Sequence, residues 1–147
     1  KSFNSLGVLK LVEAQKLNLD QDINTFLKTW KFPYDSISKG KKINIAQLLS
    51  HTAGLSVSGF GGYEKGQALP TITQILDGAK PANSNAVRSI FEPSLKFQYS
   101  GGGTTVSQLI VEDVTGDYFN VQSDICYQDY DPLKAACFVL LMALGDE

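Results

Sequence analysis

Apolar residues recur at steps of three and four in three separate stretches of the chain, and this spacing predicts helices rather than strands. The stretches cover residues 3 to about 15, residues 23–30 and residues 104–114. A period near 3.6 places such residues on one face of a helix, and that face has to be buried against other elements. We therefore expect a chain organised mainly by helices.

Shorter elements are predicted between these helices. Residues 43–45 alternate apolar and polar side chains as a short strand does, and either Asn44 or a nearby residue could cap the apolar run that follows. Thr71 and Gln74 fit a capping box for another short helix. Residues 56–69 contain four glycines and no period of either kind. They are predicted to form a long loop, and long loops in compact domains are often functional.

Charge and composition exclude several classes of protein. The 147 residues carry 13 Lys+Arg against 15 Asp+Glu, a net charge of −2, which is not the basic excess of a nucleic-acid binder. The longest apolar run, residues 135–144, is about half the roughly 20 residues that a membrane-spanning helix needs. Cys126 and Cys137 give neither a disulfide scaffold nor a metal-ligand spacing. We expect no nucleic-acid partner, no membrane span, no metal and no organic cofactor.

Four stretches, taken in order, are more specific than any of them alone. Residues 1–20 begin KSFNSLGVLKLVE, residues 45–55 read IAQLLSHTAGL, residues 91–101 read FEPSLKFQYSG, and residues 102–116 end in EDVTG. Together they resemble the serine β-lactamase and penicillin-binding-protein-like hydrolases, especially the branch of class C β-lactamases, DD-carboxypeptidases and esterases. The resemblance covers about residues 1–120, as an interior fragment of such a domain.

The resemblance implies a fold and a reaction. The parent fold would be α+β, the β-lactamase/transpeptidase-like fold, in which an antiparallel sheet joins a helical subdomain. Residues 1–147 would form one partial domain and supply mainly the helical part, with a weak match after about residue 120. The implied reaction is acyl transfer to water through a serine ester, on a small-molecule ester, a peptide or amide, or a lactam. A periplasmic or secreted location is implied by the resemblance alone.

The resemblance also assigns site residues by position. Lys1 stands at the lysine of the family's Ser-x-x-Lys motif and Tyr99 at the tyrosine of its Tyr-x-Asn motif, followed by Ser100 and Gly101. A serine hydroxyl is a poor nucleophile and needs a base, which a lysine one helical turn away or a tyrosine within hydrogen-bond reach can provide. Lys1 and Tyr99 are therefore the predicted catalytic residues, and Ser100 and Gly101 the predicted substrate-binding residues.

The sequence departs from the family pattern at three points. The serine expected three positions before Lys1 lies outside this chain, so we expect the chain alone not to be acylated. The third family motif, a Lys-Thr-Gly or His-x-Gly on an edge strand, also lies outside it. Gly101 stands where many members carry Asn. The missing amide side chain favours an ester as substrate, followed by a peptide or amide, and then a lactam.

Two alternatives to a fragment of an active serine hydrolase stay open. One is a catalytically dead family member that binds a ligand or partner through the glycine-rich loop around Phe60 and Tyr63. The other is a truncated product without activity. A serine three positions upstream of Lys1 would favour the enzyme over the dead member, and mapping the tail against the genomic reading frame would identify a truncated product.

His51 follows Ser50 directly, which suggests a Ser-His pair. Adjacent residues on a helix point in different directions, and no third group that could orient the imidazole is evident. We therefore predict that His51 is a structural histidine that forms hydrogen bonds.

A piece without its sheet would leave apolar helix faces uncovered. Each large apolar side chain left in water forfeits roughly 1.5–3 kcal/mol, against a typical net stability of about 5–15 kcal/mol. We therefore expect the chain alone to be partly molten or oligomeric. The side chains expected to lose their cover are Leu6, Leu9, Val106, Leu109 and Ile110.

Overall fold

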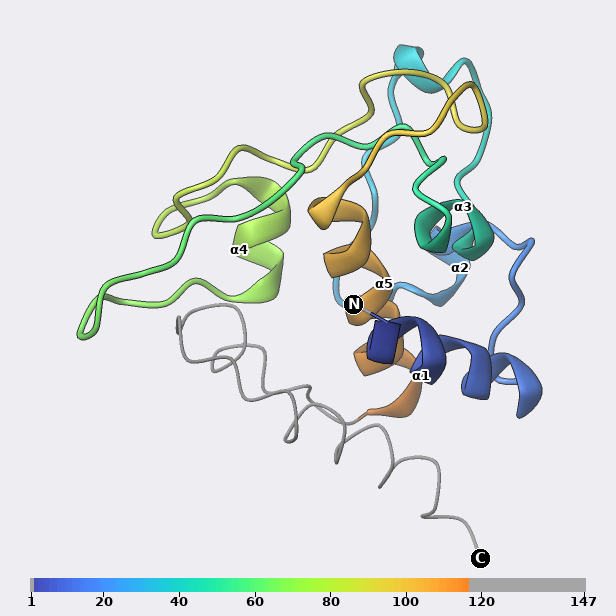
Figure 1. Cartoon of the computed structure of the whole chain (residues 1–147), viewed down its shortest axis with the longest axis horizontal. Coiled ribbons are helices and arrows are strands. Elements are labelled where there is room, and N and C mark those ends of the chain that lie inside the picture. Colours follow the sequence, from blue (N-terminus) through green and yellow to red (C-terminus); the bar gives the residue numbers. More distant parts are fainter. Residues whose placement is uncertain (1, 117–147) are drawn as a thin grey trace, which may run out of the picture.

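A computed structural model describes residues 2–116 of the protein, and within these the chain is mostly helical (Figure 1). Over this part of the chain there is no strand beyond two isolated bridges, and no helix is long and apolar enough to cross a membrane. Expectations about Lys1, the two cysteines and the apolar run near the C-terminus lie outside the described residues. The elements are α1 (Ser2–Glu13), α2 (Ile23–Phe26), the 3-10 helix η1 (Ser36–Ser38), α3 (Ile45–Leu49), α4 (Ile72–Asp77) and α5 (Gly101–Thr115).

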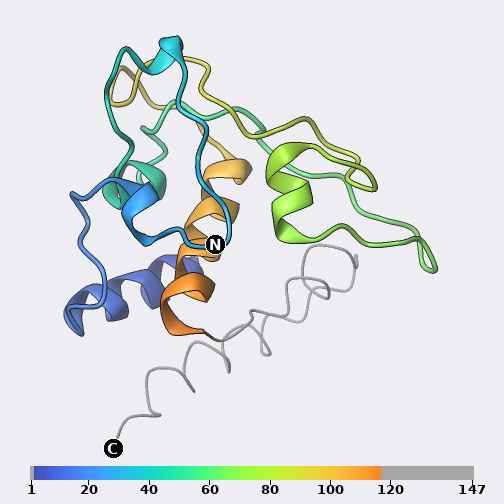
Figure 2. The same cartoon turned by 180° about the vertical axis from the view of Figure 1, so that it is seen from behind.

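Helix α5 is the element against which the other helices pack. Helices α1, α2, α3 and α4 all contact it, and α4 lies on the side of α5 opposite to the other three (Figures 1 and 2). Val106, Leu109 and Ile110 on α5 are therefore at most 2% exposed. The expectation that these three side chains are uncovered is wrong, because short helices cover α5 from both sides.

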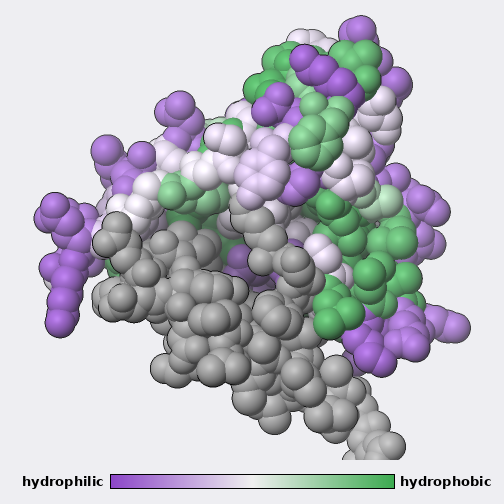
Figure 3. All heavy atoms as spheres, in the orientation of Figure 1, coloured by the Kyte–Doolittle hydropathy of each residue, from purple (hydrophilic) through white to green (hydrophobic). Residues whose placement is uncertain are grey.

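Helix α1 buries only part of its apolar face. Val8 is fully buried, whereas Leu6 is 54% and Leu9 47% exposed, as expected. Figure 3 shows apolar residues gathered over this part of the surface. The Asn4 side chain donates a hydrogen bond of 2.7 Å to the Ser107 hydroxyl, which ties α1 to α5.

The second helix is shorter than its apolar spacing predicts. The spacing runs to residue 30, but α2 ends at Phe26, and Leu27 has an extended backbone with ψ of 122°. Asp113 on α5 accepts hydrogen bonds from the backbone N–H groups of Lys28, at 2.7 Å, and Thr29, at 3.1 Å. A further helical turn would need those two donors for its own bonds, so their capture by a buried carboxylate ends the helix.

Residues 43–45 do not form the predicted strand. Asn44 makes only an isolated bridge to Asp22, and Ile45 is already the first residue of α3. The Asn44 side chain accepts from the Gln47 N–H, and the Gln47 side chain accepts from the Asn44 N–H, both at 2.9 Å. This reciprocal cap favours a helix over a single bridge. The predicted capping role of Asn44 is confirmed.

The predicted capping box of α4 is also confirmed. The Thr71 hydroxyl accepts from the Gln74 N–H at 3.2 Å, and the Gln74 side chain accepts from the Thr71 N–H at 2.8 Å. Gly78 ends the helix in the left-handed conformation, with φ of 62°. Residues 56–69 contain no helix or strand, as their glycines predict.

Replacing Asp113 with Ala should destabilise the protein, because two backbone donors lose their acceptor in a half-buried place, at roughly 1–3 kcal/mol for each group left unpaired. Asp35→Ala is the matched control, since its carboxylate accepts a single bond, from the exposed Ile37 N–H at 3.0 Å. Urea unfolding followed by circular dichroism should show a clearly larger loss for Asp113→Ala. Equal losses would contradict the role of Asp113.

Candidate active site

The predicted site motif, residues 99–101, lies where α5 begins. Ser100 is the N-cap: its hydroxyl accepts from the Gly103 N–H at 2.8 Å and donates to the Ser56 carbonyl at 2.8 Å. Because this hydroxyl binds a donor of the first turn, the helix starts at Gly101. That start lies before Thr104, where the apolar spacing placed it.

The first part of the long loop crosses the N-terminal end of α5. Three successive carbonyl oxygens, those of residues 56–58, accept hydrogen bonds from the Ser100 hydroxyl at 2.8 Å, the Gly102 N–H at 2.9 Å and the Gly101 N–H at 3.2 Å. The first N–H groups of a helix have no partner within the helix and can bind an anion. Here the protein's own backbone takes them, so this helix end is closed.

The glycine run of residues 101–103 permits this close approach of backbones. A Cβ atom at Gly101 would lie 2.9 Å from the Ser58 carbonyl oxygen, and one at Gly102 would lie 2.7 Å from a Val87 methyl group. At Gly103 the nearest atom would be 3.6 Å away, which is ordinary contact. Position 101 therefore faces the loop backbone, and an asparagine there would require the loop to move.

Tyr99 is the most exposed residue of the motif. It is 38% exposed, whereas Ser100 is 3% exposed and Gly101 is buried. Its ring lies against the His51 imidazole, with centroids 4.6 Å apart and planes inclined by 40°. A phenol at the surface next to a buried cap can reach a bound molecule, whereas the Ser100 hydroxyl is already used inside the protein.

His51 belongs to this arrangement through its neighbours in space. Its Nδ1 atom accepts a hydrogen bond from the Ser100 N–H at 3.3 Å, which confirms the predicted structural role. The Ser50 hydroxyl instead donates to the Ala46 carbonyl and bonds to the Thr52 hydroxyl, each at 2.8 Å. Ser50 and His51 are therefore adjacent in sequence without forming a catalytic pair.

Lys1 lies outside the described residues, so its catalytic role stays a prediction. The neighbouring helix nevertheless constrains the region. The Asn4–Ser107 bond holds the first turn of α1 about two turns from the start of α5. The N-terminal end of α1 therefore packs on α5, the same helix that begins at the motif of residues 99–101.

Two lysines form ion pairs with Glu92, which lies in the segment that precedes Tyr99. The Glu92 carboxylate pairs with Lys41 at 3.2 Å and with Lys39 at 3.3 Å. The hydrogen bonds from Lys41 and then Lys39 hold the pKa of Glu92 below its usual value. These pairs connect the turn after η1 to the segment that precedes the site.

The glycine-rich loop is tied down near its tip. The Asn83 N–H donates to the Tyr63 hydroxyl, and the Asn83 side chain donates to the Gly62 carbonyl, both at 3.0 Å. Phe60 packs against the hydrophobic core. Both aromatic side chains of the alternative binding loop thus have partners inside the protein.

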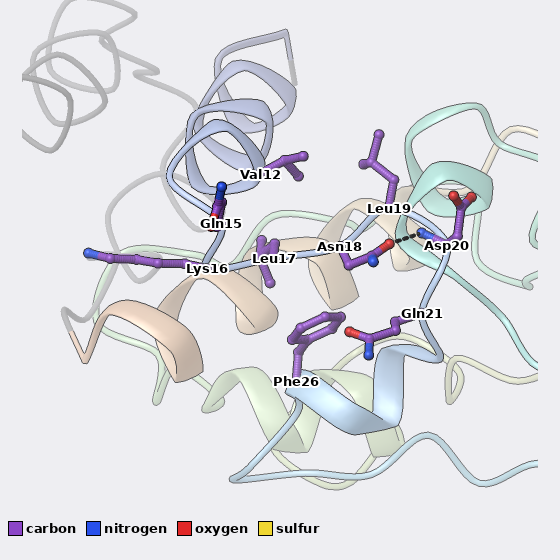
Figure 4. Close-up of a pocket in the computed structure, with 9 residues that line it drawn as sticks. All are labelled: Val12, Gln15, Lys16, Leu17, Asn18, Leu19, Asp20, Gln21 and Phe26. Atoms are coloured by element: carbon purple, nitrogen blue, oxygen red, sulfur yellow. Dashed lines mark hydrogen bonds between the residues drawn. The ribbon is translucent and has the colours of Figure 1, made fainter.

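An open groove of about 580 Å³ lies between the end of α1 and α2 (Figure 4). Its lining does not include the motif of residues 99–101 or His51. Nowhere in residues 2–116 do three or more His, Cys, Asp or Glu gather in a way that could hold a metal ion. The groove is lined by Val12, Gln15, Lys16, Leu17, Asn18, Leu19, Asp20, Gln21 and Phe26.

Comparison with known proteins identifies the class. The model of the Beta-lactamase family matches residues 1–122, so the chain belongs to the Beta-lactamase family. This confirms the resemblance seen in the four sequence stretches, and it supports a hydrolase in general terms.

The individual relatives share only about a quarter of their aligned residues with this chain. The chain is similar to Protein flp of Staphylococcus aureus, from strains N315, Mu50 and MRSA252, with 27% identity over 118 residues in each case. The matched part covers 78% of this chain and 22% of each relative. The chain thus spans about a fifth of the length of the curated relatives it matches.

Two features of the site went unnoticed in the sequence. The first is the set of carbonyls at residues 56–58 that accept hydrogen bonds from residues 100–102. The second is the contact of His51 with residues 98–100, which depends on segments 47–49 residues apart. Neither has a local sequence signal, because each partner comes from a distant part of the chain.

The glycines at the start of α5 allow a matched test. Gly102→Ala should lower the melting midpoint by several degrees, because its methyl group would overlap Val87 and the Ser56 carbonyl. Gly103→Ala should be neutral or raise stability by up to about 1 kcal/mol, because alanine is the better helix former. Thermal unfolding of both variants checks this, and an equal loss in both would contradict the close approach at residue 102.

Proposed function

We propose that the chain is the tyrosine-bearing, mostly helical part of a serine hydrolase, which transfers an acyl group to water through a serine ester. The observation that carries the proposal is the exposed Tyr99 phenol at the start of α5, fixed beside the buried Ser100 cap in a member of the Beta-lactamase family. The complete fold would add an antiparallel sheet to the described helices. The catalytically dead scaffold and the inactive truncated product are the alternatives to this proposal.

The roles of the residues follow from the chemistry of acylation. The nucleophilic serine lies outside the 147 residues in this proposal, and Lys1 keeps it deprotonated or oriented. Tyr99 relays the proton: its phenolate oxygen accepts the proton that the serine hydroxyl loses, and the phenol so formed donates that proton to the leaving group. Ser100 and Gly101 form the substrate side of the site next to the phenol, with their N–H groups bonded inside the protein.

The substrate class is proposed from Gly101. Glycine offers no side-chain amide to hold an acyl-amide group, and the Ser58 carbonyl leaves no room for one unless the loop moves. A small ester is therefore the first substrate to test, followed by a peptide or amide, and then a lactam.

The 147-residue chain alone should not be labelled by a fluorophosphonate or by a fluorescent penicillin, because its nucleophile lies elsewhere. Gel fluorescence and mass spectrometry of the treated chain measure this, with an active serine hydrolase as the positive control. Stoichiometric labelling of any residue in this chain would remove Lys1 from the motif position.

Tyr99→Phe, in the complete enzyme that carries the serine, should lower the turnover of a p-nitrophenyl ester by about 10²–10⁴-fold, because general acid–base help is worth that much. The melting midpoint should change little, since the ring and its packing stay. A rate within about threefold of the wild type would exclude Tyr99 from the mechanism and favour a scaffold.

Tyr34→Phe is the matched control for this change. The Tyr34 hydroxyl donates to Asp22 at 2.6 Å and accepts from the Ile43 N–H at 3.0 Å. Burial, and next the bond to Asp22, raise the pKa of Tyr34 well above its usual value, so the phenol stays neutral. Losing this hydroxyl should cost stability, roughly 1–3 kcal/mol, and leave ester turnover unchanged.

A further inference from the structure

One residue holds the backbone on both sides of Tyr99. The His51 carbonyl accepts from the Gln98 N–H at 2.8 Å, and the His51 side chain accepts through Nδ1 from the Ser100 N–H at 3.3 Å. The two N–H groups that flank Tyr99 are thus bonded to the same residue. We call this pair of hydrogen bonds, which holds the backbone on both sides of Tyr99, the bracket by His51.

The backbone of His51 makes this double contact possible. Its φ is +57°, in the left-handed region that non-glycine residues seldom adopt. Such a conformation costs of order 1–3 kcal/mol and persists only where the surrounding structure demands it. At the end of α3 it turns both the carbonyl and the imidazole of one residue toward residues 98–100.

The imidazole also fixes the direction of the Tyr99 ring. It lies 4.6 Å from that ring, and on the edge of the Phe97 ring at 6.0 Å with an interplanar angle of 83°. The hydrogen bond from the Ser100 N–H to Nδ1 ties one side of the imidazole to the backbone. A ring held by one hydrogen bond and two aromatic contacts has little freedom to rotate.

We propose that His51 is a positioning residue that sets where the Tyr99 hydroxyl lies. This rests on the proposed role of Tyr99 in proton transfer. His51 itself exchanges no proton with the substrate in this proposal. It acts through the place of the phenol, and a displacement of about 1 Å in a reacting group can cost about 10²-fold in rate.

Two substitutions separate the hydrogen bond from the ring. His51→Phe keeps a ring against Tyr99 and removes the acceptor, so kcat for a p-nitrophenyl ester should fall by about 10–100-fold with KM little changed. His51→Asn offers an oxygen near the Nδ1 position and tolerates the left-handed backbone. The kcat of His51→Asn should therefore be about tenfold higher than that of His51→Phe.

A double-mutant cycle in the complete enzyme tests whether His51 acts through Tyr99. With Tyr99→Phe already present, His51→Phe should lower kcat by less than about threefold, because there is no hydroxyl left to place. If Tyr99→Phe is severe and His51→Phe costs the same with or without it, His51 does not act through Tyr99 and this proposal is overturned. If Tyr99→Phe alone has no effect, the proposed function fails instead.

The contact can also be observed directly by NMR in the complete enzyme that carries the serine. Through-hydrogen-bond nitrogen–nitrogen coupling between the Ser100 amide and the His51 Nδ1 atom should be visible by NMR in the wild type and absent in His51→Phe. Spectra in which the Ser100 amide couples to no imidazole nitrogen would overturn the proposal, independently of any activity. Melting midpoints of the variants keep loss of folding separate from loss of positioning.

Discussion

The packing of a loop backbone across the N-terminal end of α5 is the constraint on which the rest of the structure depends. The first N–H groups of that helix have to find acceptors outside the helix, and they find them in the Ser100 hydroxyl and the carbonyls of residues 57 and 58. Only residues without a side chain allow these backbones to approach so closely. The glycine run therefore sets both the start of the central helix and the course of the loop beside it.

Three residues with a strained backbone lie in segments that contact this part of the chain, whereas Gln15 and Lys39, which also have positive φ, lie elsewhere. His51, Val57 and Ser94 all adopt positive φ, which is most unusual for the β-branched Val57. Each makes a bond that shapes the site: the His51 carbonyl holds Gln98, the Val57 carbonyl holds Gly102, and the Ser94 N–H donates to the Thr52 carbonyl. Strain of this kind clusters where a structure positions functional groups. It is an argument for function that does not depend on the family assignment.

Local signals predicted the parts of the fold that local interactions decide. The two longest helices and both capping boxes follow from apolar spacing and from cap residues within three positions of their partners. The predicted second helix is present, but it ends earlier than predicted because Asp113, 84 and 85 residues away, takes the donors of the next turn. The site divides in the same way. Tyr99 was found only through the resemblance to a family, and the bracket by His51 depends on contacts that no local pattern encodes.

The central helix serves stability and the site at once. The buried side chains of α5 hold four other helices, while its first turn fixes the residue that precedes Ser100. A core substitution that shifts α5 along its axis would therefore also move Tyr99, which directly precedes the Ser100 cap of that helix. Because a packed interior transmits strain rather than absorbing it, stability and catalytic geometry should vary together in this part of the protein. The bracket by His51 limits that coupling, because it ties the motif to α3 as well as to α5.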